Sequence, residues 1–447
     1  MHINKIISLL LAFQIYCLTI VQANPLTEYQ EARSVYLESA ACMAAYDNRY
    51  GEMAFSALQQ AGWQIHYFHM EHPSSDAKFI FMKKIDPISN SPIFLLAVAG
   101  TETGKDINTD LRFGQVYFGG NTVKTFSEKA EEKNIDKTFP KVHKGFHEVV
   151  QTAFSADTLE GPGKESFTDY LLKHPDQKLI LTGHSLGGAA ATLIGARLIS
   201  MGVHPDQIKV VTFASPAVGN DPFARQFENT LDLTRFVMSG DQVTSILQDL
   251  VGGYRQFGKV VHWQAPEHIV MHPHSMTVYL DIAAKNYYQE RQQAVQAGVI
   301  HLPMQALETD GPKVYVAPIK NSLPRPLAPN FPPMAEGLRD AYRTTFSQYI
   351  FANSEEDLQT SFKNASAAGC QWLISSDLQG HSVKNKQDVY YLTLAQMVYT
   401  VPDGRIVDGQ SIGSNTKEMT PLIAMLHNIK TIGNQHLDRL IDPEKQY

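Results

Sequence analysis

The feature that most constrains the fold is Lys178–Arg197, KLILTGHSLGGAAATLIGAR, where an apolar run meets Gly-His-Ser-Leu-Gly and a stretch of small residues. In the pattern Gly183-x-Ser185-x-Gly187 a serine occupies a tight turn between a strand and a helix. Such a turn strains the serine backbone, so its neighbours must be small. The run Leu179–Leu181 favours a buried parallel strand. We therefore predict a nucleophilic serine above a parallel sheet; a bystander serine in a glycine-rich turn is the alternative.

Apolar strands alternate with helices from about Pro25 to Ala306, which favours an α/β fold with a mainly parallel sheet covered on both faces. Expected strands are Phe79–Met82, Ile93–Ala99, Leu179–Leu181, Lys209–Ala214, Thr234–Met238 and Val260–Trp263. Expected helices are Leu26–Met43, His143–Phe154, Ser166–His174, Gly187–Ser200 and Ser275–Gln296. We expect one domain over residues 24–306 and a smaller one over 311–447.

The N-terminus predicts export. A short basic start precedes the apolar run Ile6–Val21, and small residues lead up to Ala23, which is typical of a secretory signal peptide cleaved after that residue. The prediction is a secreted or periplasmic protein; a retained N-terminal anchor is the alternative. Cys42 and Cys370 then remain, either as a disulfide or as two buried thiols. The net charge of −7 and the lack of a basic stripe argue against a nucleic-acid partner.

A serine hydroxyl needs a general base, and the base needs an orienting carboxylate. After a turn of this type the acid and then the histidine follow on loops behind later strands. Asp241 comes just after the strand that ends at Met238, where such sites collect. Asp221 is the competitor, but its position favours capping a helix that begins at Pro222. We predict Asp241 as the acid.

Four nearby histidines compete for the role of the base. His262 alternates within a predicted strand, and His268 lies further along the same stretch. His274 directly precedes the start of a predicted helix, which places it on the loop that leads into the last helix of the domain. His272 is the fallback. We predict His274 as the base.

An oxyanion hole requires two donors aimed at the charge that develops on the substrate carbonyl oxygen. One is expected from the backbone N–H of Leu186, at the start of the helix after the serine. The other is expected at Thr101, where a predicted strand ends in Gly-Thr. A plain strand-ending turn at Thr101 is the alternative.

Over residues 30–285 the chain resembles the class 3 lipases, which have the α/β-hydrolase fold. The blocks that carry the resemblance are Ala99–Thr103, Asn108–Leu111, Val142–Phe146, Thr182–Gly188, Phe213–Asn220, Gly240–Val243, Gly253–Arg255, and His274 with Tyr279. The resemblance implies a triad of Ser185, Asp241 and His274, with Thr101 and Leu186 at the oxyanion hole.

Two departures from the family pattern stand near the predicted oxyanion loop. Ala99 replaces the usual arginine, and Ile107-Asn108 lacks the usual tryptophan. Neither position breaks bonds, so we interpret both as changes in support. The segment Arg112–Phe126 stands where such enzymes carry a lid. Its aromatic residues fit either a cover over an acyl pocket or the core of an extra hairpin.

The C-terminal segment predicts a separate α+β unit. Val389–Val401 and Arg405–Gly413 flank an Asp-Gly turn, which is a hairpin signal. Expected neighbours are Val314–Ile319, Met334–Ser347, Gln371–Asp377 and Leu422–Ile441. The order is weakly similar to envelope domains of the TolB and CsgG type, which implies docking to an envelope partner or packing on the first domain.

These patterns predict an exported serine hydrolase that cleaves carboxylic esters of lipids through an acyl-enzyme on Ser185. A lipid ester is the expected substrate, with transient contact to a lipid surface. No motif indicates a metal or a cofactor. The alternatives are a phospholipase A1 or lysophospholipase with the same triad, and a non-catalytic envelope-binding protein with a hydrolase-like domain.

Overall fold

The computed structural model describes residues 24–46, 49–70, 77–86, 90–100, 114–154, 166–307, 311–401 and 403–433. The predicted signal peptide, residues 1–23, lies outside this part of the chain. Within the described residues, no helix combines the length and the apolar character needed to cross a membrane.

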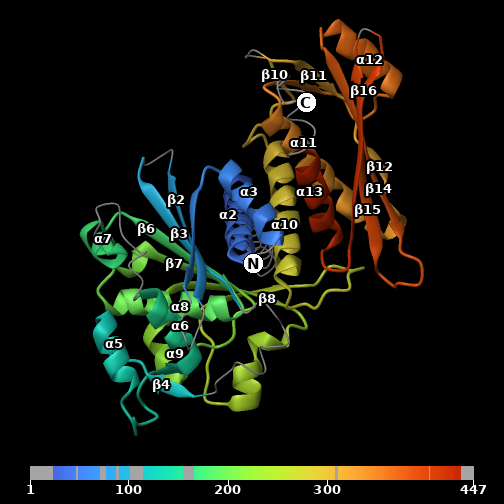
Figure 1. Cartoon of the computed structure of the whole chain (residues 1–447). Helices are drawn as coiled ribbons and strands as arrows, with labels where there is room; N and C mark the ends of the chain where they lie inside the picture. Colours follow the sequence, from blue (N-terminus) through green and yellow to red (C-terminus); the bar gives the residue numbers. More distant parts are fainter. Residues whose placement is uncertain are drawn as a thin grey trace, which may run out of the picture.

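The first sheet has seven strands in the order β1-β2-β3-β6-β7-β8-β9 (Figure 1). They are β1 Gln64–Met70, β2 Ala77–Ile85, β3 Pro92–Val98, β6 Lys178–His184, β7 Ile208–Phe213, β8 Asp232–Met238 and β9 Lys259–Trp263. Strands β3, β6, β7, β8 and β9 run parallel, and β1 and β2 add an antiparallel edge. The six expected strands are confirmed, while β1 has no counterpart among them.

Helices cover both faces of this sheet, as the alternation of buried residues along the strands shows. Ile80 of β2 belongs to the core on the side of α2 Pro25–Ala44, α3 Arg49–Gln60 and α10 Met276–Gln296. Its neighbour Phe79 faces the other core, with α6 Lys144–Phe154, α7 Phe167–Lys173, α8 Leu186–Ser200 and α9 Asp221–Phe227. This is the predicted α/β-hydrolase architecture, and the fold class is confirmed.

The second sheet follows the order β10-β13-β11-β14-β15-β16, with β12 beside β14. Its strands are β10 Gln305–Ala306, β11 Lys313–Val316, β12 Lys320–Ser322, β13 Gln348–Phe351, β14 Trp372–Ser382, β15 Tyr390–Thr400 and β16 Ile406–Asn415. The helices of this unit are α11 Phe331–Thr345, α12 Leu358–Ala367 and α13 Pro421–Ile432. The predicted hairpin is present as β15 and β16. Since β10 pairs with β13, the second sheet begins before the expected boundary at residue 306.

The remaining elements are short. They are β4 Gln115–Tyr117, α5 Val123–Ala130, β5 Lys141–His143, and the helical turns η1 Pro205–Gln207, η2 Gln242–Thr244, η3 Leu247–Val251 and η4 Arg325–Asn330.

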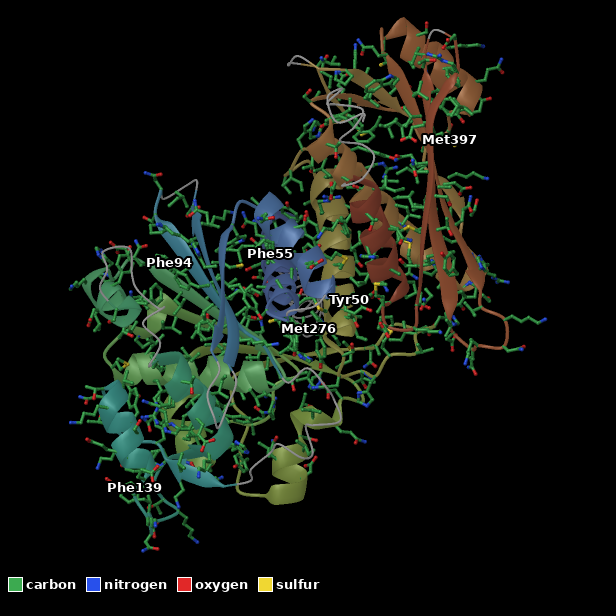
Figure 2. The ribbon with its side chains drawn as sticks, viewed as in Figure 1. Tyr50, Phe55, Phe94, Phe139, Met276 and Met397 are labelled. Atoms are coloured by element: carbon green, nitrogen blue, oxygen red, sulfur yellow. The ribbon has the colours of Figure 1, made fainter. Side chains whose placement is uncertain are left out.

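The two sheets share one hydrophobic core. The cluster that contains α2 and α10 continues through α11 and α13 into the second sheet, so these helices lie between the sheets (Figure 1). Figure 2 shows Tyr50 and Met276 among these helices. The Tyr50 hydroxyl donates to Glu418, 2.8 Å away, in the segment between β16 and α13. Whether residues 24–306 and 311–447 fold as separate domains stays a prediction.

Cys42 and Cys370 are free and buried. Cys42 lies in the shared core, with its sulfur 3.1 Å from Thr182 Oγ1, whereas Cys370 lies in a small cluster of the second unit. Of the two expectations, the structure has the pair of buried thiols.

Two aromatic residues in the described part of the predicted lid segment belong to the core. Phe118 and Phe126 are buried and sandwich the Arg197 guanidinium, whose carbon lies 3.9 and 4.0 Å from the two ring centroids. Arg197 Nη1 also donates to the Gly119 carbonyl at 2.9 Å, and burial lowers the arginine pKa to about 9. These contacts fasten residues 118–126 to the helix behind Ser185. Residues 101–113 lie outside the described residues.

A buried ion-pair cluster joins the two units, and its removal is expected to destabilise the protein. Arg291 on α10 is 4% exposed and donates to Asp340 at 2.7 Å and to Glu336 at 2.8 Å, both on α11. Arg291→Met removes the buried cation that bridges the two units and leaves Glu336 and Asp340 only their partners on α11, Arg339 and Arg343. We therefore expect the free energy of unfolding to fall by about 2 kcal/mol in urea denaturation. Arg339→Met removes only a same-helix partner of Glu336 and should cost under about 0.5 kcal/mol. Equal losses in both variants would contradict this role for Arg291.

Candidate active site

The turn between β6 and α8 holds Ser185 in a strained conformation. Its φ of 56° and ψ of −127° are rare for a residue with a side chain. A Cβ on Gly183 would lie 2.2 Å from the Gly187 carbonyl oxygen, and one on Gly187 would lie 2.1 Å from the Val98 carbonyl oxygen. Both glycines are therefore required, because the helix start presses directly on two strands.

The structure brings the three predicted triad residues together. Ser185 Oγ lies 3.0 Å from His274 Nε2, and His274 Nδ1 lies 3.0 Å from both carboxylate oxygens of Asp241. All three residues are buried. The carboxylate only accepts, so Nδ1 carries the imidazole proton and Nε2 is free to accept the Ser185 proton. This is the geometry that activates a serine.

Asp241 is kept ionised by neutral hydrogen-bond donors. The residue follows β8, and its carboxylate accepts from the Val243 N–H at 3.1 Å and from the Tyr279 hydroxyl at 2.9 Å. Burial raises the pKa of Asp241, but the hydrogen bond and the charge of His274, followed by the bonds from Tyr279 and Val243, outweigh it, so its pKa is lowered overall. Tyr279 is itself fixed by the Met238 N–H at 2.8 Å.

A second histidine positions the first. His184, the residue before the serine, donates from Nε2 to the His274 carbonyl at 2.8 Å, and its Nδ1 accepts from the Tyr46 hydroxyl at 2.7 Å. Burial, followed by the nearby His274, lowers the pKa of His184 to about 3, so the ring is neutral, as these two bonds require. Tyr46 follows α2, and no sequence pattern indicated this role.

The competing candidates lie elsewhere. Asp221 is the first residue of α9 and pairs with Arg225 and Arg255. The helix cap expected there belongs to its neighbour Asn220, whose side chain accepts from the Phe223 N–H.

The other histidines serve other contacts. His262 is exposed on β9. His272 Nδ1 accepts from the His274 N–H at 3.1 Å and so shapes the loop. His268 bonds to Asp388, on the turn between β14 and β15.

The predicted oxyanion donors are only partly described. Leu186 is the first residue of α8, and the first N–H groups of a helix have no acceptor within it. The loop after β3 also reaches Ser185, since a Cβ on Gly100 would lie 3.2 Å from the Ser185 Cβ. Thr101 lies outside the described residues.

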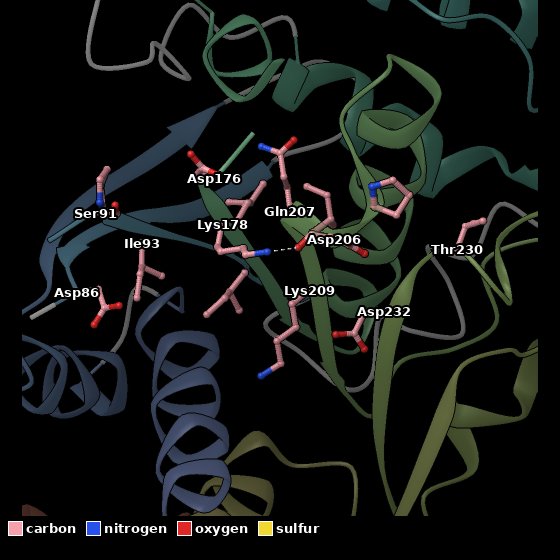
Figure 3. Close-up of a pocket in the computed structure, with 15 residues that line it drawn as sticks. Asp86, Ser91, Ile93, Asp176, Lys178, Asp206, Gln207, Lys209, Thr230 and Asp232 are labelled. Carbon is pink, nitrogen blue, oxygen red and sulfur yellow. Dashed lines mark hydrogen bonds between the residues drawn. The ribbon is translucent and has the colours of Figure 1, made fainter. Parts of the chain in front are cut away.

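A cavity lies at the opposite edge of the sheet. Figure 3 shows this space of about 630 Å³ at the amino ends of β6, β7 and β8, with Lys178, Asp206 and Asp232 among its lining residues. None of the three triad residues lines it. Among the described residues, no group of three or more His, Cys, Asp or Glu side chains is arranged to hold a metal ion.

Comparisons with known proteins match part of the chain to lipases. Residues 95–250 match the family model described as lipase (class 3). A Saccharomyces cerevisiae protein with a provisional lipase name is 29% identical over 171 residues, 38% of this chain and 48% of that protein. The secreted mono- and diacylglycerol lipase 1 of Fusarium solani is 40% identical over 82 residues, 18% of this chain and 24% of that protein. The matches thus span about half or less of these relatives.

Two further comparisons extend the set. Phospholipase A1-II 3 of Oryza sativa subsp. indica is 31% identical over 126 residues, 25% of this chain and 30% of that protein. The solved structure of Rhizomucor miehei triacylglyceride lipase matches with a TM-score of 0.38 and 18% identity, covering 52% of this chain and 80% of that one.

We expect Tyr279→Phe to lower kcat on a soluble ester about tenfold with KM unchanged. The change removes one donor from the Asp241 carboxylate and leaves the buried Met238 N–H without its acceptor. Steady-state kinetics on p-nitrophenyl butyrate provide the measurement. Tyr288→Phe, on the same helix but facing the second unit, is the matched control and should keep the wild-type kcat. A wild-type kcat in Tyr279→Phe would contradict the role of this hydroxyl.

Proposed function

With a class 3 lipase segment at residues 95–250, we propose that the chain is a serine hydrolase that cleaves carboxylic esters of lipids. The observation that carries the proposal is the continuous contact from Ser185 through His274 to Asp241. The family match includes Ser185 and Asp241 but ends before His274, so the base is identified by its geometry in this chain.

In the first half of the reaction Ser185 Oγ attacks the acyl carbonyl carbon while His274 Nε2 takes the hydroxyl proton. Asp241 stabilises the imidazolium that forms. The π electrons of the substrate carbonyl move onto the carbonyl oxygen, which the Leu186 N–H and Thr101 are proposed to bind. The tetrahedral intermediate then collapses, the ester C–O bond breaks, and His274 gives its proton to the leaving alcohol.

In the second half water attacks the acyl-enzyme. His274 takes a proton from the water, the new oxyanion occupies the same hole, and the bond from the acyl carbon to Ser185 breaks. The proton returns to Ser185 Oγ, and the carboxylic acid leaves. No metal or cofactor takes part in the proposed steps.

Labelling with a fluorophosphonate probe tests the proposal. The probe forms a phosphorus–oxygen bond to an activated serine and releases fluoride, so we expect rapid labelling of the mature wild type. Ser185→Ala should abolish labelling, and His274→Ala should slow it at least about 100-fold, because general-base assistance is worth 10² or more. A folded wild type that stays unlabelled, even with lipid present, would contradict the proposed hydrolase activity and favour the envelope-binding alternative.

The match to a rice phospholipase A1 favours phospholipids as a second substrate class. The same triad would act on either ester. Release of fatty acid from triacylglycerol compared with phospholipid vesicles, using the labelled wild type, separates the two classes.

Export is proposed from the sequence of residues 1–23. Expression in a Gram-negative host should yield a mature chain that begins at Asn24 in the periplasm or medium. N-terminal sequencing of the fractionated protein measures this. A chain recovered in the membrane with Met1 intact would indicate the retained anchor instead.

A further inference from the structure

The loop that carries His274 is long and irregular. It begins after Trp263, where β9 ends, and leads to Ser275 before α10. Its two ends are fixed, since the Trp263 carbonyl accepts from the Ser239 N–H and the Ser275 carbonyl from the Val278 N–H. His268 lies near the middle, far along the chain from both anchors. A loop fixed only at its ends samples many conformations, which would weaken the placement of His274.

The second sheet supplies a contact at this mid-loop position. His268 Nδ1 lies 3.0 Å from Asp388 Oδ1, on the turn between β14 and β15. Among the described residues it is the one side-chain hydrogen bond that ties Gln264–Met271 to another element. Figure 1 agrees, since the loop after β9 extends toward the end of the second sheet.

The backbone on both sides is shaped for this contact. His268 has a φ of 59° and Asp388 a φ of 51°, both in the left-handed region that costs energy for residues with a side chain. Such conformations persist where surrounding contacts hold them. Around them, Ile269 and Met271 pack against the core that the two units share. The backbone is therefore shaped for the contact on both sides of the junction.

We propose that Asp388 of the C-terminal unit is a positioning residue for the hydrolase site, holding the His274 loop through His268. The proposal rests on the proposed function, because it assigns the second unit a part in the reaction of Ser185. Asp388 touches no reacting atom. Its effect passes along the backbone from His268 to His274.

The test compares two glycine substitutions in the same turn. Asp388→Gly keeps the left-handed backbone and removes the acceptor, whereas Asn385→Gly, at an exposed residue with a φ of 59°, is the matched control. On p-nitrophenyl butyrate we expect Asp388→Gly to lower kcat about fivefold with KM unchanged, the upper range for a partly exposed side-chain pair. Asn385→Gly should match the wild type, and Asp388→Asn, which keeps an acceptor, should retain most of the rate.

A double-mutant cycle separates positioning from general loss of structure. His268→Asn tolerates the left-handed backbone but is too short to keep the bond, so adding Asp388→Gly should cost nothing further. A full fivefold loss in that background, or equal rates for Asp388→Gly and Asn385→Gly, would overturn the proposal.

Hydrogen exchange by mass spectrometry over residues 264–274 gives a readout that needs no activity. Asp388→Gly should exchange faster there than Asn385→Gly. If the fluorophosphonate does not label the wild type but Asp388→Gly still exchanges faster over residues 264–274, the result contradicts the proposed serine-hydrolase function and supports the role of the contact in ordering the loop. Unchanged exchange in a labelled enzyme would overturn the positioning role alone.

Discussion

The hydrogen bond between Ser185 and His274 depends on two segments 89 residues apart meeting within 3.0 Å. The tightly packed β6–α8 turn holds Ser185 in one strained backbone conformation. The histidine comes from an irregular loop and needs outside support. His184 supplies part of it, because its ring holds the His274 carbonyl while its backbone belongs to the nucleophile turn. One short segment therefore aligns both partners of the reaction.

Apart from His274, the groups that donate hydrogen bonds to the charged Asp241 carboxylate are neutral. Of the donors to Asp241, only His274 can become a cation; Tyr279 and the Val243 N–H cannot. A permanently charged donor would hold the carboxylate as firmly but would compete with the imidazolium for it. Neutral donors keep Asp241 ionised and leave its full attraction for His274 in the charged state. The low pKa of His184 fits the same arrangement, because a second cation beside His274 would oppose proton uptake.

Local patterns allowed the sequence to predict the parallel strands, the helices between them and the turn at Ser185. Short-range rules also placed Asp241 after β8 and His274 before α10. Tyr46 could not be found this way, because its contact with His184 spans 138 residues and no periodicity reports it. The antiparallel edge strand β1 escaped prediction for a similar reason: its residues, QIHYFHM, mix polar and aromatic side chains without clear alternation.

The C-terminal unit looked separable in the sequence because its helices and hairpin form a complete α+β pattern. That pattern did not show what the apolar faces of α11 and α13 pack against. The structure places them in one core with α2 and α10, so the helices that cover the first sheet pack on the helices that cover the second. The predicted base directly precedes α10, and its loop touches the second sheet at Asp388. A layer shared in this way makes the position of His274 depend on both units, even though the family match ends at residue 250.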